Sequence, residues 1–396
     1  MPTTTRRGAA LALILAGVVA AFQVGKAAIA VPALQRDLHL ALSAAAWVIG
    51  AYGMIGAIFG LPAGIVSSLF SARRTMLAGL LAAGFGSIAG GFAGDDMMLV
   101  ATRVLEGCGL LAASVAIPRL LRSVVAPADL DAVLALWGTY LPIGVAVMML
   151  AGPLVLGHGW QALWFANGAV ALGMAAAVAF LRIDEPAPVT PLGAAALRDG
   201  LAVLRKPGAW LLALSFGVYV FQSMAMAGLL PTLLVRRMDL PVAAAGVITA
   251  LTLLANAAGN ASAGLLMRFG VPTWAALACG FACTAITSVG IFHDAMPLAA
   301  VTALACLNLG ITGLIPGSIF AAASRLAATS ATLAVALGLI NQASNVGSLS
   351  GPTAMAAVVE RFGWGRAPLL FVAVGAVGIG IALALRPVLR GPSQTP

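Results

Sequence analysis

The chain has 396 residues, of which 62% are hydrophobic and 8% are charged, and its mean hydropathy is +1.06. About a quarter of the residues in a soluble globular protein are charged, so this composition excludes an ordinary water-soluble domain and indicates an integral membrane protein. The net charge of +9 would also suit a nucleic-acid partner. The distribution of the basic residues along the chain tests that interpretation.

Twelve apolar segments are long enough to cross a bilayer, which takes roughly 20 apolar residues each. The longest polar break between them, residues 183–208, divides the chain almost in half, and its 192–206 part has the pattern of a short amphipathic surface helix. We predict an all-α membrane protein with an N-terminal six-helix bundle (1–182), a cytoplasmic linker (183–208) and a C-terminal six-helix bundle (209–396). The predicted spans are 9–34, 44–68, 75–93, 97–121, 132–157, 162–182, 209–235, 242–266, 273–292, 296–322, 330–355 and 367–386.

Basic residues are distributed unevenly between the two sides of these spans. With both termini in the cytoplasm, fourteen of the 21 Lys and Arg residues lie on the inner side and five on the outer side. An excess of this sign is typical of cytoplasmic loops. We therefore predict a multi-pass protein of a bacterial inner membrane with both termini cytoplasmic, surrounded by lipid and without a nucleic-acid partner.

The two halves of the chain resemble each other at an offset of 199 residues. Several small or polar residues recur at this offset, which indicates a parallel internal repeat of two six-helix units. The matched pairs are Gln23 with Gln222, Pro32 with Pro231, Gly60 with Gly259, and Gly152 with Gly351.

A short motif in the fourth span, "RVLEGCG" (residues 103–109), resembles a signature of the major facilitator superfamily of secondary transporters. The resemblance extends over essentially the whole chain and implies the fold of that family, in which two six-helix halves enclose a substrate site near the middle of the membrane. It also implies a role for Arg103 in coupling ion movement to transport, with Glu106 beside it. Gly107 and Gly109 permit close helix packing.

A narrower resemblance is to the cyanate and nitroimidazole porter branch of that family. The evidence is "AIPRLL", which follows the motif, and "LWGTYLPIG" in the fifth span, which ends at a Gly-Trp pair.

Three charged residues lie well inside predicted spans: Lys26, Arg103 and Glu106. A charge in the hydrocarbon core is costly unless it is paired or hydrated, and these three fall at similar depths, so we expect a cluster with a net charge of +1. Glu106 then either only neutralises its neighbours and locks two helices together, or the surplus positive charge attracts an anionic substrate. Lys26 corresponds to Ala225 in the second half, so the repeated scaffold does not require a lysine there.

Uncharged polar residues in the spans are further candidates for binding a substrate. Those in "LINQASNVGSLSGP" lie on one stripe of the eleventh span, although each is equally suited to bonding a neighbouring helix. The predicted substrate-binding residues are Lys26, Arg103, Gln23, Tyr52, Tyr140, Gln222, Asn308, Asn341, Gln342 and Asn345, and the predicted proton-coupling residues are Glu106 and Arg103.

Together these features predict a monomeric secondary transporter that works by alternating access and is coupled to protons. The favoured substrate is a small organic or pseudohalide-like anion bound by Lys26 and Arg103, with Glu106 as the titrating carboxylate. The alternative is a drug/proton antiporter that exports lipophilic cations or neutral compounds, and a channel or a sensor of the same fold is a third class. No nucleophile–base pair and no set of metal ligands is visible in the sequence, so we expect no enzyme activity, cofactor or metal.

Overall fold

The computed structural model describes residues 4–66, 70–181, 183, 198, 200–326 and 330–390. These residues form helices and short connections, with no strand among them. Each of the twelve predicted spans coincides with one helix or with two consecutive helices, which confirms an all-α membrane protein. Residues 192–197 and 199 of the predicted amphipathic segment 192–206 lie outside the described residues, and the described part contains a 3-10 turn, η3, at Ala202–Arg205.

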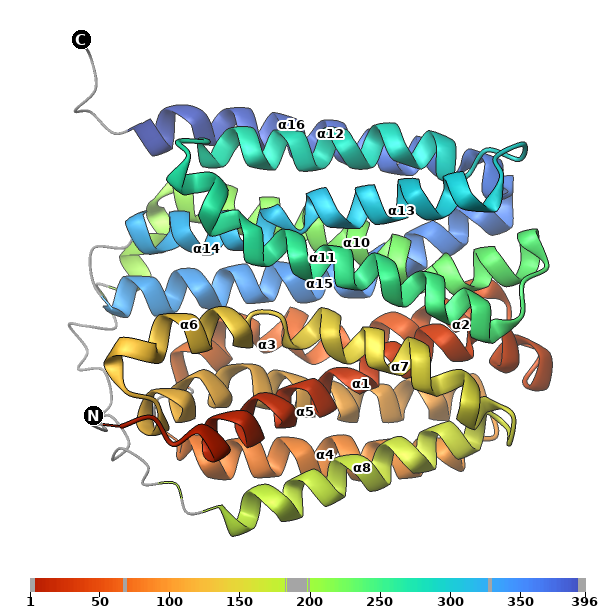
Figure 1. Cartoon of the computed structure of the whole chain (residues 1–396), viewed down its shortest axis with the longest axis horizontal. Coiled ribbons are helices and arrows are strands. Elements are labelled where there is room, and N and C mark those ends of the chain that lie inside the picture. The colour runs from red at the N-terminus through yellow and green to blue at the C-terminus, as the bar shows by residue number, and fades with distance from the viewer. Residues whose placement is uncertain are drawn as a thin grey trace. The chain divides into compact units, whose positions relative to one another are not determined.

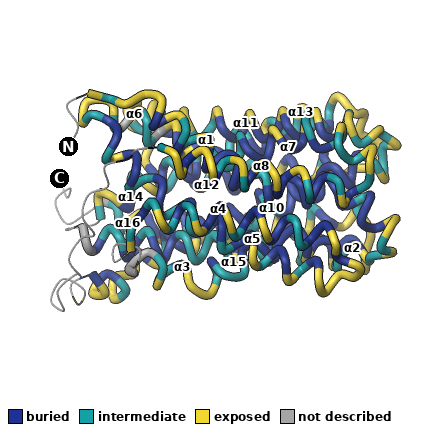
Figure 2. The backbone as a smooth tube through the Cα atoms, turned by 90° about the horizontal axis from the view of Figure 1, so that it is seen from below, coloured by how far each residue is buried: buried dark blue, intermediate teal, exposed yellow. Residues whose placement is uncertain are grey.

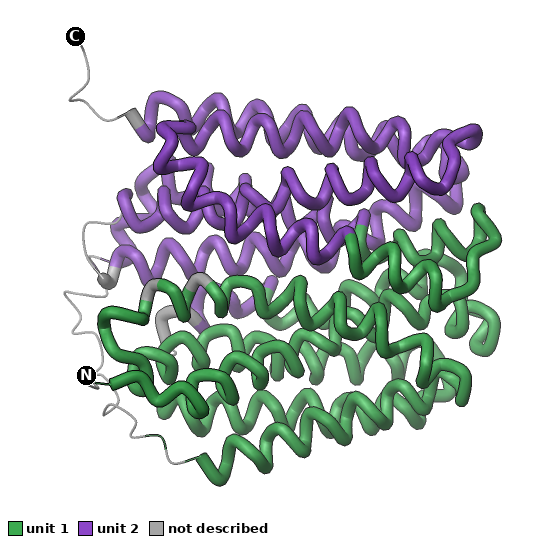
Figure 3. The backbone as a smooth tube through the Cα atoms, in the orientation of Figure 1, with its two compact units in different colours: residues 1–56, 66–191, 227–251 green, residues 57–65, 192–226, 252–396 purple. Residues whose placement is uncertain are grey.

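The chain forms two compact units, which we describe separately (Figure 3). Unit 1 contains Met1–Gly56, Val66–Pro191 and Ala227–Leu251, and therefore includes a short piece of the second half of the chain. Its complete elements are α1 (Arg7–Asp37), α2 (Leu42–Gly50), η1 (Ala51–Gly53), α4 (Ala72–Gly91), α5 (Asp96–Val124), α6 (Pro127–Trp137), α7 (Tyr140–Leu156) and α8 (Trp160–Phe180).

Unit 2 contains Ala57–Ile65, Leu192–Met226 and Thr252–Pro396. The helices α3 (Met54–Val66), α10 (Pro207–Met238) and α11 (Val242–Arg268) contribute residues to both units. The elements that lie wholly in unit 2, besides η3, are α12 (Thr273–Ile291), α13 (Leu298–Thr312), α14 (Leu314–Leu326), α15 (Ser330–Phe362), η4 (Trp364–Arg366) and α16 (Ala367–Arg390) (Figure 1).

Proline explains two of the places where a predicted span divides into two helices. Pro142 and Pro316 cannot donate a backbone hydrogen bond to the residues four positions earlier, Gly138 and Thr312. The chain breaks there, between α6 and α7 and between α13 and α14. Pro153 and Pro352, by contrast, lie inside continuous helices.

The surface of the helices fits a lipid environment. Nine segments of the described chain are long and apolar enough to cross a membrane, and the shorter apolar helix α7 adds to them. Large apolar side chains such as Leu154, Phe180 and Ile286 are exposed, as expected where the solvent is hydrocarbon. Along the helices, exposed and buried residues alternate (Figure 2).

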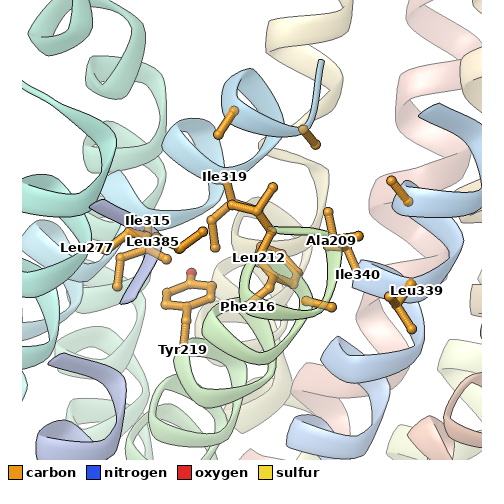
Figure 4. Close-up of a cluster of buried hydrophobic side chains, with 14 of the residues drawn as sticks. Ala209, Leu212, Phe216, Tyr219, Leu277, Ile315, Ile319, Leu339, Ile340 and Leu385 are labelled. Carbon is orange, nitrogen blue, oxygen red and sulfur yellow. The ribbon is translucent and has the colours of Figure 1, made fainter. Parts of the chain in front are cut away.

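The core of unit 2 is an apolar cluster contributed mainly by α10, α12, α14, α15 and α16 (Figure 4). Phe216 and Tyr219 of α10 point into it beside Ile315 of α14 and Leu277 of α12. In unit 1, α1 packs against α5, α7 and α8, and α4 packs against α5 and α8. This arrangement surrounds the middle of α1 with other helices and determines where its lysine lies.

Candidate functional site

The three predicted intramembrane charges meet in the interior of unit 1. Lys26 Nζ lies 2.8 Å from Glu106 Oε1, and Arg103 Nη1 donates to the other oxygen of the same carboxylate. All three side chains are 0% exposed. The three residues therefore meet in one buried cluster, in which the carboxylate of Glu106 lies between the basic groups of Lys26 and Arg103.

Local helix geometry creates the acidic half of this cluster. Arg103 and Glu106 are three residues apart on α5, a spacing that places both side chains on the same helix face. Gly86 of α4 faces them, and a Cβ at Gly86 would lie 3.1 Å from Glu106 Cγ. The absence of a side chain at Gly86 therefore lets α4 approach α5 closely at the level of the carboxylate.

Ser87 and Trp164 complete the surroundings of Lys26. Lys26 Nζ donates to Ser87 Oγ at 2.6 Å, and Ser87 Oγ in turn donates to the Trp164 carbonyl at 2.7 Å. The ammonium also lies 4.8 Å from the centroid of the Trp164 ring, within the range of a cation–π interaction. Lys26 of α1 is thus held by α4, α5 and α8 together.

Arg103 also contacts α2 and η1. Its Nε donates to the Val48 carbonyl of α2 at 2.9 Å, and its guanidinium carbon lies 5.7 Å from the centroid of the Tyr52 ring. Arg103 Nη2 and both polar atoms of the Gln23 amide are buried without a hydrogen-bond partner among the described residues. Buried polar atoms of this kind commonly bind an ordered water or a polar ligand.

The remaining candidates of unit 1 and those of unit 2 have other partners. Tyr140 stacks on Trp137 with ring centroids 4.2 Å apart. In unit 2, Gln222 donates to the Phe371 carbonyl at 3.2 Å, and Asn308 donates to Thr287 Oγ1 at 2.7 Å. Asn345 Nδ2 donates to the Asn341 carbonyl and, more weakly, to its side chain. These contacts are interhelical or local, and they do not join the charged cluster.

Gln342 has a distinctive position on α15. Its Nε2 donates to the Ala57 carbonyl at 2.9 Å, and its Oε1 accepts from the Leu61 amide at 3.3 Å. These two backbone groups are the acceptor and the donor of one turn of α3, immediately before Pro62. The Gln342 amide is thus inserted into a helical turn next to a proline, a recognised cause of helix kinks.

An apolar pocket of about 550 Å³ lies beside Gln342, within unit 2. Its size falls in the range of pockets that hold drug-sized molecules. Hydrophobic residues of α10 and α15 form most of its wall, and the Gln342 and Ser350 side chains contribute polar atoms. Both are already bonded, because Ser350 Oγ donates to the Val346 carbonyl at 2.6 Å. The pocket therefore suits an apolar ligand.

Ser87 and Trp164 are parts of the charged cluster that the sequence did not reveal. Ser87 stands in a glycine-rich helix, "AAGFGSIAGG", where a serine is normally a packing residue. Its place inside the third predicted span did not indicate that it faces Lys26. Trp164 follows the Gly-Trp pair at the start of α8, and nothing in the sequence connects it to Lys26.

Comparison with known proteins identifies the class of this molecule. A family model described as Major Facilitator Superfamily matches residues 13–341, so the chain belongs to this superfamily. It is a transporter and not an enzyme. Two solved structures of a bacterial homologue of the human lysosomal transporter Spinster have the same fold, with TM-scores of 0.73 and 0.72 at 14% and 13% identity. The first match covers 97% of this chain and 94% of the other.

Several curated relatives are named for resistance to drugs or antibiotics. The tetracenomycin C resistance and export protein of Streptomyces glaucescens is 35% identical over 158 residues, which are 39% of this chain and 29% of that protein. The puromycin resistance protein of Streptomyces alboniger is 32% identical over 146 residues (36% and 29%). The multidrug resistance protein Stp of Mycobacterium tuberculosis is 30% identical over 157 residues (39% and 28%). The matched part spans less than a third of each of these relatives.

These relatives correct one interpretation of the sequence. The resemblance to the cyanate and nitroimidazole porter branch is not supported, because the similar proteins are named for resistance to drugs and antibiotics, one of them also for export. The motif "RVLEGCG" lies within the residues that the family model matches, and the short stretches around it did not carry enough information to choose a branch.

Proposed function

We propose that this protein is a proton-coupled exporter of small lipophilic compounds in a bacterial plasma membrane, and that it works as a monomer. The names of the relatives support export of drug-like molecules. The observation that carries the proposal within this chain is the contrast between the charged cluster of unit 1 and the apolar pocket of unit 2. The charges are engaged with one another inside unit 1, while the pocket in unit 2 is lined by apolar residues.

The apolar pocket supports neutral or lipophilic substrates. Its lining includes Trp210 and Phe221 of α10 and Leu339 and Val346 of α15. Aromatic and branched side chains are the usual lining for apolar ligands, which need few hydrogen bonds to be held. We infer that substrates reach this pocket from the lipid phase, where such compounds concentrate.

The charged cluster supports proton coupling. Buried ionisable groups inside a membrane protein are expensive, and they commonly serve proton movement. The positions of Arg103 and Glu106 in the superfamily motif agree with this role. Under our proposal Gln23, Tyr52 and Tyr140 contribute to the same polar interior of unit 1. Gln222, Asn308, Asn341, Gln342 and Asn345 contribute to helix packing or to substrate contact in unit 2.

Transport of a small anion is the second candidate function. One observation favours it: Arg103 Nη2 is buried without a hydrogen-bond partner among the described residues, and the cluster as a whole carries a surplus positive charge. In this alternative a carboxylate or cyanate binds Arg103 Nη2 and Lys26.

Reconstituted vesicles separate the two candidates. Purified protein is reconstituted in liposomes with an imposed pH gradient, and the movement of tetraphenylphosphonium, a neutral anthraquinone dye or cyanate across the membrane is measured. Our proposal expects gradient-driven movement of the first two compounds and none of cyanate, with protein-free liposomes as the control. Movement of cyanate alone would establish the anion transporter instead.

A further inference from the structure

We propose that the proton exchanged during transport is carried by the amine of Lys26. This inference rests on the proposed proton-coupled function and names the group that binds the proton. The step is Lys26–NH₃⁺ → Lys26–NH₂ + H⁺: one N–H bond breaks, its electron pair stays on nitrogen, and the proton passes to water.

The hydrogen bonds of Lys26 leave one proton free to depart. An ammonium has three N–H donors. In the structure one faces Ser87 Oγ at 2.6 Å and one faces Glu106 Oε1 at 2.8 Å. The described residues place no third oxygen acceptor on Nζ, and the Trp164 ring lies on that side, 4.8 Å away at its centroid. A neutral amine keeps two N–H groups and therefore keeps both hydrogen bonds.

Ser87 accepts a hydrogen bond from Lys26 and cannot donate one to it. The single hydroxyl proton of Ser87 is donated to the Trp164 carbonyl at 2.7 Å, so its oxygen can only accept from Lys26. The amine does not need to turn or exchange partners when it loses a proton. What changes on proton loss is the charge opposite the Trp164 ring.

The charge of the cluster favours Lys26 over Glu106 as the titrating group. With all three residues ionised the cluster carries +1 in a site that is 0% exposed. Loss of a proton from Lys26 leaves the neutral Arg103–Glu106 pair. Protonation of Glu106 instead leaves two cations and no anion, and burial strongly disfavours such an unpaired charge.

The helices packed around Lys26 carry the following other titratable groups. On α5 these are Arg103 and Glu106, and η1 contributes Tyr52 beside Arg103. Helices α2 and α8 carry no titratable side chain. The remaining groups on the packed helices are Arg7, Arg36 and Asp37 at the ends of α1, Arg73 and Arg74 in the first turn of α4, Asp96, Cys108, Arg119 and Arg122 elsewhere on α5, Asp129 and Asp131 on α6, and Tyr140 in the first turn of α7.

The internal repeat indicates that a lysine at this position is specific to the first half of the chain. Lys26 corresponds to Ala225 at the offset of 199 residues, whereas the neighbouring Gln23 corresponds to Gln222. The scaffold therefore forms with an alanine at the lysine position. The lysine is an addition to the repeated architecture, as expected of a residue with its own function.

Fluorescence of Trp164 tests the proposal without any substrate. The full chain in lipid nanodiscs is titrated from pH 4 to pH 10, and the signal of Trp164 is taken as wild type minus Trp164→Phe. We expect a single pH transition in this difference signal, caused by loss of the cation opposite the ring. We expect it to vanish in Lys26→Arg, which keeps a permanent cation, and to move to lower pH in Glu106→Gln, where the Lys26 ammonium has lost its anionic partner.

Three outcomes would overturn the proposal: no transition in the wild type, an unchanged transition in Lys26→Arg, or an unchanged transition in Glu106→Gln although circular dichroism shows that this variant is folded. If Glu106→Gln does not fold, proton release on addition of tetraphenylphosphonium decides, since Lys26→Arg should bind the compound and release no proton. A wild type that shows the pH transition but neither binds nor moves any compound contradicts the proposed function and leaves the titration of Lys26 intact.

Discussion

Replacing Glu106 with Gln removes the carboxylate that joins two buried cations, whereas replacing Lys26 with Met removes the surplus charge. The first change leaves Lys26 and Arg103 facing each other without an anion. Removing one partner of a buried ion pair costs about 3–5 kcal/mol. The second change leaves the Arg103–Glu106 pair neutral and loses the hydrogen bonds of Lys26 to Glu106 Oε1 and Ser87 Oγ. Ser87 still donates to the Trp164 carbonyl, so the main cost is the unsatisfied carboxylate oxygen, about 1–3 kcal/mol.

The two variants should therefore differ in stability by about 2 kcal/mol, with Glu106→Gln the less stable. Unfolding in mixed detergent–SDS micelles, followed by helical circular dichroism, gives the free energy of each variant relative to the wild type. The double variant Lys26→Met/Glu106→Gln should recover part of the loss, because only one unpaired cation then remains. Equal stabilities, or a less stable Lys26→Met, would falsify the view that Glu106 is shared by two cations.

Three further predictions concern the surroundings of the cluster and the pocket. Gly86→Val should destabilise unit 1 by about 1–3 kcal/mol through overpacking against Glu106, whereas Gly173→Val, where a Cβ meets nothing within 4 Å, should stay close to the wild type in the same unfolding assay. Gln342→Leu should lower the transport rate more than Gln342→Glu, which keeps an acceptor for the Leu61 amide; equal rates in liposomes would contradict this. Ala343→Phe narrows the apolar pocket and should raise the KM for large compounds several-fold, while a KM unchanged for all compounds would exclude this pocket from transport.

The sequence predicted the fold and the charged cluster because both depend on strong local signals. Apolar segment length locates the spans, and a charge inside a span must find a partner at its own depth. Lys26, Arg103 and Glu106 meet for this reason. The breaks that divide three of the spans into two helices are marked less clearly in the sequence, although Pro142 and Pro316 explain two of them.

The rest of the site depends on tertiary contacts that leave no pattern in the sequence. Ser87 reaches Lys26 because α4 packs against both α5 and α8, and a serine in a glycine-rich helix does not show which neighbour it faces. Gln342 suggested a substrate ligand by its polarity alone. Its backbone partners on α3 come from a region far away in the sequence, so the contact was not predictable from spacing.

The central claim, proton-driven export of lipophilic compounds, is tested most directly by one transport measurement. Proteoliposomes with wild-type protein and an imposed pH gradient are loaded with tetraphenylphosphonium, and its movement is compared with that in Lys26→Arg and Ser262→Ala proteoliposomes; Ser262 is exposed and bonds the Ala258 carbonyl of its own helix. We predict accumulation against the concentration gradient that collapses when the pH gradient is dissipated, persists in Ser262→Ala and is lost in Lys26→Arg. Movement that is unaffected by the pH gradient, or that is equal in all three proteins, would contradict the account.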